Sequence, residues 1–186
     1  NVETSQTIVN CLYGALGALG SAQGTMNNLT FGNARFQYYE TICSGAPAGP
    51  GFDGASAVQT HMTNSRLTDP EVLELRYPVL LERFEIARGS GGKGEWCAGD
   101  GTRRVIRFLE EMDCAILSGF RNVRPFGTKG GAAGQIGENW VRRAGGHLER
   151  LKSADQTVIA AGEAVIIKTP TGGGYGTLAS KGRRSR

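Results

Sequence analysis

The sequence predicts an α+β fold of mostly antiparallel β-structure, with one N-terminal amphipathic helix and long glycine-rich loops. Only one stretch has clear helical periodicity, several β-prone runs follow one another across short turns, and strands do not alternate with helices as they would in a parallel sheet. With 186 residues, 39% of them hydrophobic, the chain can bury a core in one domain. We assign residues 1–180 to that domain and 181–186 to a basic tail.

The first predicted elements are a helix over residues 3–19 and a hairpin over 29–42. In the helix, apolar side chains recur at near-helical spacing, and Gly20 provides a stop. In the hairpin, aromatic and β-branched residues flank Gly32 and Asn33, which can turn the chain.

The middle of the chain alternates loops with short elements. Residues 43–56 are rich in glycine and proline and predict a long loop, of the kind that often carries function. A short helical turn is expected over 70–75 and a strand over 77–86, before a glycine cluster at 89–101.

Two further hairpins are predicted in the second half. One joins residues 103–109 to 112–117 across Glu110 and Glu111, and the other joins 157–160 to 164–169.

The net charge of +4 comes from the end of the chain. Four of the 21 basic residues lie in the last six positions, and the rest of the chain has 17 bases and 17 acids. We interpret the tail as a solvated end and expect no nucleic acid partner. The longest weakly polar run has twelve residues, whereas a membrane span needs about 20, so no membrane association is expected.

The cysteines and the first residue suggest where the protein works and how it arises. The four cysteines form no C-x-x-C motif, so we expect reduced thiols in a cytoplasmic protein and no zinc site. The chain opens on Asn1 without an initiator methionine, which suggests a fragment or a processed product.

Two glycine motifs are candidates for binding. Gly89–Gly94 matches G-x-G-x-x-G, but no helix can follow it, and Gly94 stands where a phosphate-binding loop needs Ser or Thr. It is either a nest of backbone N–H groups for a carboxylate or carbonyl oxygen, with Lys93 nearby, or a plain turn. Residues 172–176 are either a lid or a mobile end.

Few side chains are suited to catalysis. His61 follows the loop that holds Asp53, and a carboxylate that orients an imidazole could make a general base; the alternative is a structural histidine. Asp100 precedes Arg103 and Arg104, which suggests either a carboxylate clamp or a surface ion pair. The two histidines, His61 and His147, form no metal motif by spacing.

Eight segments in collinear order resemble the C-terminal part of the hydantoinase B/oxoprolinase family. They cover nearly the whole chain: NVETSQ, QGTMNN, GNARFQYYETI, DGASAVQTHMTNSRLTDPEVLELRYPVLLERFEI, SGGKG, GDGTRRVIRF, RPFGTKGG and TPTGGGYG. The sequence departs from the family's pattern at Cys43-Ser44, Cys97-Ala98 and Thr171.

The resemblance implies part of an ATP-dependent amidohydrolase that opens a cyclic amide, either 5-oxoproline to glutamate or a hydantoin to an N-carbamoyl amino acid. An unstrained lactam is a poor electrophile, and phosphorylation of its oxygen would activate it. The alternatives are a subunit of an acetone- or acetophenone-type carboxylase and a non-catalytic docking module.

The resemblance also implies where the cofactors are held. ATP and magnesium are expected on a partner A-type subunit or domain, and any divalent metal in the N-terminal part of the B unit, which this sequence lacks. This chain alone is expected to bind neither.

We predict that the segments 53–64 and 90–100 converge on one cleft. The predicted catalytic residues are His61 and Asp100, and the predicted substrate-binding residues are Asp53, Asn64, Ser90, Gly91 and Gly92. The alternative is that both loops turn the chain at opposite ends of a sheet.

Overall fold

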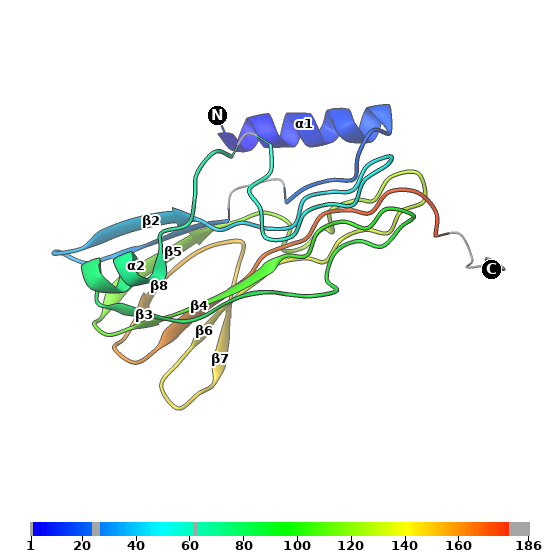
Figure 1. Ribbon diagram of the computed structural model, residues 1–186. Helices are drawn as coiled ribbons and strands as arrows, with labels where there is room; N and C mark the ends of the chain where they lie inside the picture. The colour runs from blue at the N-terminus through cyan, green and yellow to red at the C-terminus, as the bar shows by residue number, and fades with distance from the viewer. Residues whose placement is uncertain (1, 24–26, 62, 179–186) are drawn as a thin grey trace.

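A computed structural model describes residues 2–23, 27–61 and 63–178, so the basic tail lies outside the described residues. Within these ranges the chain forms two helices and nine strands (Figure 1). The helices are α1 (Val2–Leu16) and α2 (Pro70–Arg76). The strands are β1 (Asn28–Gly32), β2 (Gln37–Thr41), β3 (Val79–Ile86), β4 (Thr102–Phe108), β5 (Met112–Leu117), β6 (Glu138–Arg142), β7 (Leu148–Leu151), β8 (Ala154–Ile159) and β9 (Ala164–Lys168).

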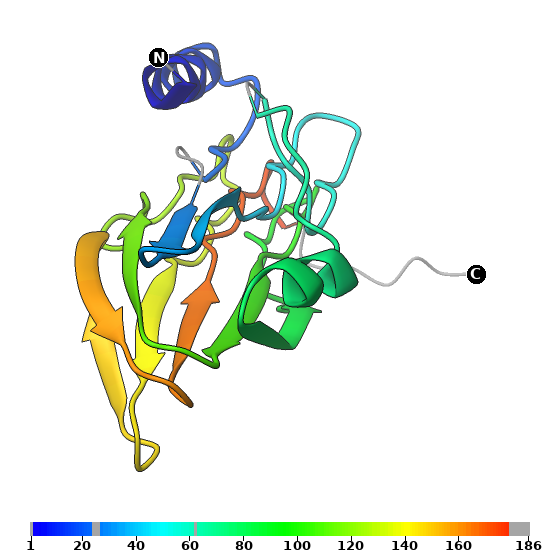
Figure 2. The ribbon, with the colours of Figure 1, turned by 90° about the vertical axis from the view of Figure 1, so that its left-hand side faces the viewer.

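The strands form two antiparallel sheets that pack face to face (Figure 2). The first sheet has the order β2-β1-β5-β8 and the second the order β3-β4-β9-β6-β7. Buried side chains from both sheets share one core, in which the rings of Phe31 on β1 and Phe108 on β4 lie 5.1 Å apart. The predicted α+β class with mostly antiparallel strands is therefore confirmed.

The predicted hairpin over 29–42 is confirmed, but the two later hairpins are wrong. β1 pairs with β2 from Asn28 opposite Thr41 to Gly32 opposite Gln37. By contrast, β4 and β5 belong to different sheets, and so do β8 and β9. Their short connections cross from one sheet to the other, because this lets the apolar faces of both strands bury in the shared core. The strands β6 and β7 were not predicted.

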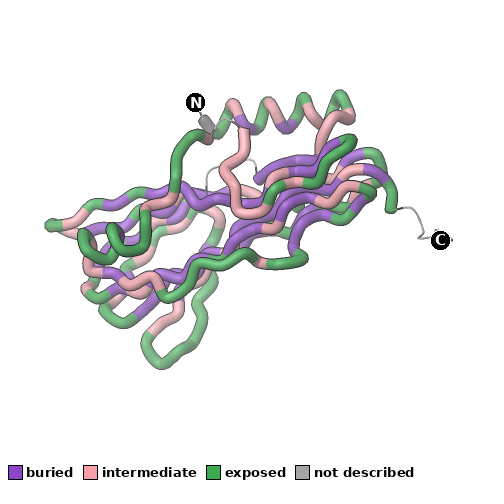
Figure 3. The backbone as a smooth tube through the Cα atoms, in the orientation of Figure 1, coloured by how far each residue is buried: buried purple, intermediate pink, exposed green. Residues whose placement is uncertain are grey.

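Beyond the sheets, glycine-rich segments run side by side without forming a sheet, and we call them the glycine bundle. Its members are residues 44–49, 53–58, 90–101, 125–135 and 169–176, and most of the inner ones are buried (Figure 3). The segment 169–176 lies at its centre, so the predicted lid or mobile end is wrong.

Hydrogen bonds from this central segment leave in several directions. The carbonyls of Gly172, Gly173 and Gly174 accept from the N–H groups of Gly92, Ala48 and Thr128, respectively, which are three separate neighbours. The direction of the carbonyl group therefore turns from one residue to the next. This is typical of an extended helix with three residues per turn, which packs closely against its neighbours only where side chains are absent. A Cβ at Gly173 would lie 1.8 Å from the carbonyl oxygen of Phe126.

The predicted N-terminal helix is present, and the predicted helical turn over 70–75 is a short helix of seven residues, α2. α1 ends earlier than predicted, because Gly17 adopts a φ of +60° and its N–H bonds to the carbonyl of Gly14. α2 begins after Asp69, whose carboxylate accepts from the N–H groups of Glu71 and Val72. Among the described residues, neither helix has the length and apolar character needed to cross a membrane.

Candidate functional site

Asp100 lies in the glycine bundle, two residues before β4, and its carboxylate is held by the loop that precedes it. The N–H groups of Gly89 and Gly91 donate to the two carboxylate oxygens at 3.0 and 2.8 Å. The backbone N–H of Asp100 donates to Ser56 Oγ at 2.9 Å. Of the two alternatives that the sequence left open, a nest of N–H groups is therefore present, and the carboxylate in it belongs to the chain itself.

The other predicted residues of this loop are fixed by contacts within the glycine bundle. Ser90 is buried, and its hydroxyl oxygen accepts from the N–H of Gly101 at 3.1 Å. The N–H of Gly92 donates to the carbonyl of Gly172 at 3.1 Å. A Cβ at Gly91 would meet the carbonyl of Ala98 at 2.0 Å, so only glycine fits there. Because these N–H groups are already paired, the loop does not fit the phosphates of ATP.

Asp53 comes from a different part of the chain and reaches the same region. Its carboxylate accepts from the N–H of Cys97 at 2.6 Å. Further along, Ala57 donates its N–H to the carbonyl of Asp100 at 3.1 Å. The structure thus brings the segments 53–57 and 97–100 side by side. That the whole segments 53–64 and 90–100 form one cleft stays a prediction.

His61 and Asn64 lie in other surroundings. His61 Nε2 is 3.5 Å from the carbonyl oxygen of Gln6, and its ring meets that of Tyr13 edge-on, so both contacts of this imidazole are to α1. Burial lowers the pKa of His61 below its usual 6.5, and the weaker opposing effect is the hydrogen bond with Gln6. Its imidazole is therefore neutral at pH 7. Asn64 is exposed.

The predicted pairing of Asp100 with Arg103 or Arg104 is wrong. Arg104 donates from Nε and Nη2 to the carboxylate of Glu40 at 2.7 and 2.9 Å, and both side chains are almost completely buried. Arg103 lies 3.9 Å from Glu85. Arg104 is on β4 and Glu40 on β2, so this ion pair joins the two sheets.

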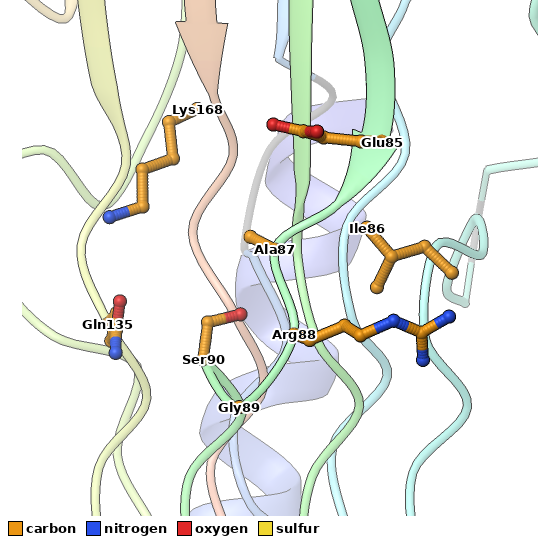
Figure 4. Close-up of a pocket in the computed structure, with 8 residues that line it drawn as sticks. All are labelled: Glu85, Ile86, Ala87, Arg88, Gly89, Ser90, Gln135 and Lys168. Atoms are coloured by element: carbon orange, nitrogen blue, oxygen red, sulfur yellow. The ribbon is translucent and has the colours of Figure 1, made fainter.

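A cavity of about 630 Å³ opens beside the nest (Figure 4). It is lined by Glu85, Ile86, Ala87, Arg88, Gly89, Ser90, Gln135 and Lys168. Ser90 is the predicted site residue that lines it. In Figure 4 the ammonium of Lys168, the amide of Gln135 and the hydroxyl of Ser90 face the same space, whereas Arg88 extends away.

This cavity can hold a small polar molecule. Lys168 can pair with a carboxylate, and the amide of Gln135 can both donate to and accept from an amide group. The sequence analysis missed Lys168 and Gln135. Lys168 could have been recognised as a candidate from its position at the end of a β-prone run, next to glycine segments. No three His, Cys, Asp or Glu residues gather as a metal site within the described ranges.

The two-sheet fold with its glycine bundle matches one known class of protein. The model of the hydantoinase B/oxoprolinase family covers residues 1–178, and the chain belongs to this family. The predicted resemblance is thereby confirmed.

Particular relatives add detail. A 5-oxoprolinase of Dictyostelium discoideum is 46% identical over 176 residues, which are 95% of this chain and 14% of that protein. A putative B-type subunit of a D-/L-hydantoinase from a Pseudomonas species is 29% identical over 77% of this chain and 25% of that protein. The chain thus spans about one seventh of the 5-oxoprolinase.

Two solved structures share the fold. The ATP-dependent caprolactamase of Pseudomonas jessenii superposes with a TM-score of 0.73 and 27% identity over 86% of this chain and 30% of that one. A nucleotide-free acetone carboxylase gives a TM-score of 0.71 at 15% identity over 85% of this chain and 26% of that one, which shows the fold alone.

Proposed function

We propose that this chain is part of an ATP-dependent enzyme that opens a cyclic amide, with 5-oxoproline as the first substrate to test and a hydantoin as the second. The observation that carries the proposal is the 46% identity to a 5-oxoprolinase over 95% of the chain. The shared fold of the caprolactamase, which is named for another lactam, supports the same class of substrate.

In this proposal the nucleotide is held by an A-type subunit or domain, together with magnesium. The paired N–H groups of Gly89, Gly91 and Gly92 support this assignment, because they leave no free nest for phosphate in this loop. The likeness to a putative B-type subunit of a hydantoinase also favours a partner. We place the enzyme in the cytoplasm, where its four free cysteines stay reduced.

Within the proposed enzyme, the cavity beside Ser90 receives the polar groups of the substrate. Lys168 would pair with a carboxylate, and Gln135 would bind the ring amide. The hydrogen bonds of Asp100 with Gly89 and Gly91 would hold this wall of the cavity in place. The catalytic roles of His61 and Asp100, and the substrate contacts of Asp53, Asn64, Gly91 and Gly92, remain predictions.

A chimeric enzyme tests the proposal. Residues 1–178 would replace the matching segment of the Dictyostelium 5-oxoprolinase, and phosphate release would be measured with 5-oxoproline, hydantoin, caprolactam, and acetone with bicarbonate. The proposal expects release with a cyclic amide. Release only with acetone and bicarbonate would favour the carboxylase. Full amide-dependent release by the His61→Gln and Lys168→Met variants would favour the docking module.

A further inference from the structure

Helix α1 exposes its apolar side and buries its polar side. Gln6 and Asn10, four residues apart, are 0% and 5% exposed. Ile8, Leu12 and Leu16, also spaced by four, are 54%, 53% and 76% exposed. Residues four apart lie on one face of a helix, so these three side chains form a continuous apolar row, which we call the α1 row. A helix on the surface of a protein normally has the opposite arrangement.

Directional contacts fix the helix in this orientation. The side-chain oxygen of Asn10 accepts from the N–H of Ala22 at 3.1 Å, and the amide of Gln6 donates to Thr63 Oγ1. The carbonyl of Gln6 also meets His61. Turning α1 to bury the row would break these contacts, so the row stays outward.

The chemistry of the row limits what can cover it. Glu3 is the one charged residue in α1, and it lies in the first turn. A strongly charged partner would therefore find no complementary charge along the row, whereas an apolar helix or sheet face would find matching apolar side chains.

We infer that the α1 row packs against an apolar surface of the polypeptide that the family relatives have beyond the matched segment. The chain spans 14% of the Dictyostelium 5-oxoprolinase and 30% of the caprolactamase chain, so most of each of these polypeptides lies outside the match. A surface in the same polypeptide is present at high effective concentration and needs no separate encounter. The inference rests on family membership and not on the proposed reaction.

Cys11 provides a native probe for this contact. It is exposed on α1, three residues after Ile8, whereas Cys43 and Cys114 are buried. In the chimeric 5-oxoprolinase we expect iodoacetamide to label Cys11 at least about tenfold more slowly than in the 186-residue chain, because labelling then requires the interface to open. Mass spectrometry of the α1 peptide measures both rates.

A substitution in the row gives a second measurement. Leu12→Glu should lower the melting temperature of the chimera by several degrees and leave that of the 186-residue chain unchanged, since the charge would be buried only in the chimera. Leu75→Glu is the matched control, because Leu75 is 87% exposed on α2. If the Leu12→Glu chimera does not fold, Leu12→Ala gives the same comparison with a smaller shift.

Other occupants of the row would give different results. Equal labelling of Cys11 in the two proteins, or no effect of the Leu12 variants on the chimera, would overturn the inference. A dimer of the 186-residue chain that protects Cys11 and is abolished by Leu12→Glu would instead assign the row to a second copy. None of these readouts depends on 5-oxoproline turnover, so they remain valid if the proposed reaction is wrong.

Discussion

The carboxylate of Asp100 accepts a hydrogen bond of 2.8 Å from the backbone N–H of Gly91, nine residues earlier in the chain. A second bond from Gly89 closes the loop around it. The carboxylate of Asp100 and the two N–H groups therefore satisfy one another's hydrogen-bonding capacity. The same two bonds hold the loop that carries Ser90, which lines the cavity.

Replacing Asp100 by Asn should destabilise the protein by about 1–3 kcal/mol, because an amide NH₂ group would face one of the two N–H donors. Urea unfolding followed by circular dichroism measures this change. Asp113→Asn, at an exposed position on β5, is the control and should have little effect. A loss of activity in the chimera with unchanged stability would instead support a direct catalytic role for Asp100.

The ion pair between Arg104 and Glu40 should be important for stability because it is buried between the sheets. Glu40→Gln should cost about 3–5 kcal/mol, since it leaves a buried guanidinium without its counter-charge. Replacing both residues by apolar ones, Glu40→Leu with Arg104→Met, should recover much of that loss. Glu110→Gln, in the exposed pair with Arg35, should change little. An equal, small effect of Glu40→Gln and Glu110→Gln would contradict this account.

His61 should make stability depend on pH. Its pKa is lowered in the folded state, so below pH 6.5 the unfolded chain takes up a proton that the folded chain resists. The contribution of His61 is present at about pH 7.5 and is lost progressively as the pH falls below 6.5. The free energy of unfolding of His61→Gln should therefore fall less between about pH 7.5 and about pH 5.5 than that of the original chain. His147→Gln, at an exposed position, is the matched control.

The centre of the glycine bundle should not tolerate a side chain. Gly173→Ala places a Cβ 1.8 Å from a backbone carbonyl, and relieving that clash should cost about 3 kcal/mol or more. Gly162→Ala is a suitable comparison, because Gly162 has a φ of +88° but open space where the Cβ would lie, so this substitution should cost about 1 kcal/mol. Thermal unfolding of both variants measures and compares these two losses of stability. Similar melting temperatures would show that the bundle is loosely packed.

The parts of the fold that were predicted correctly depend on local signals. Gly32 and Asn33 mark the turn of the first hairpin, and Asp69 with Pro70 marks the start of α2. The connections from β4 to β5 and from β8 to β9, which were wrongly predicted to be hairpins, are equally short. Whether two consecutive strands pair or face each other across a core depends on the rest of the sheet. The missed strands β6 and β7 contain few β-branched residues, although Gly145 and Gly146 between them were a usable turn signal.

The candidate site was predicted in part for the same reason. Glycines at 89–92 indicated a nest of N–H groups, yet no spacing rule identifies Asp100 as the carboxylate that enters it. Lys168 and Gln135 come from distant parts of the chain, and only the fold places them near Ser90. The orientation of His61 toward α1 likewise depends on a tertiary contact with Gln6.

The most direct test of the proposed function is to measure both products of the chimeric 5-oxoprolinase. With ATP and 5-oxoproline, the chimera carrying residues 1–178 should form glutamate and phosphate in equal amounts, and the Gly173→Ala version should form much less of both. Equal formation of the two products would show that this chain can serve as part of a cyclic amide hydrolase. A chimera that folds and assembles normally but forms no glutamate, with phosphate release unchanged by 5-oxoproline, would contradict the proposed function.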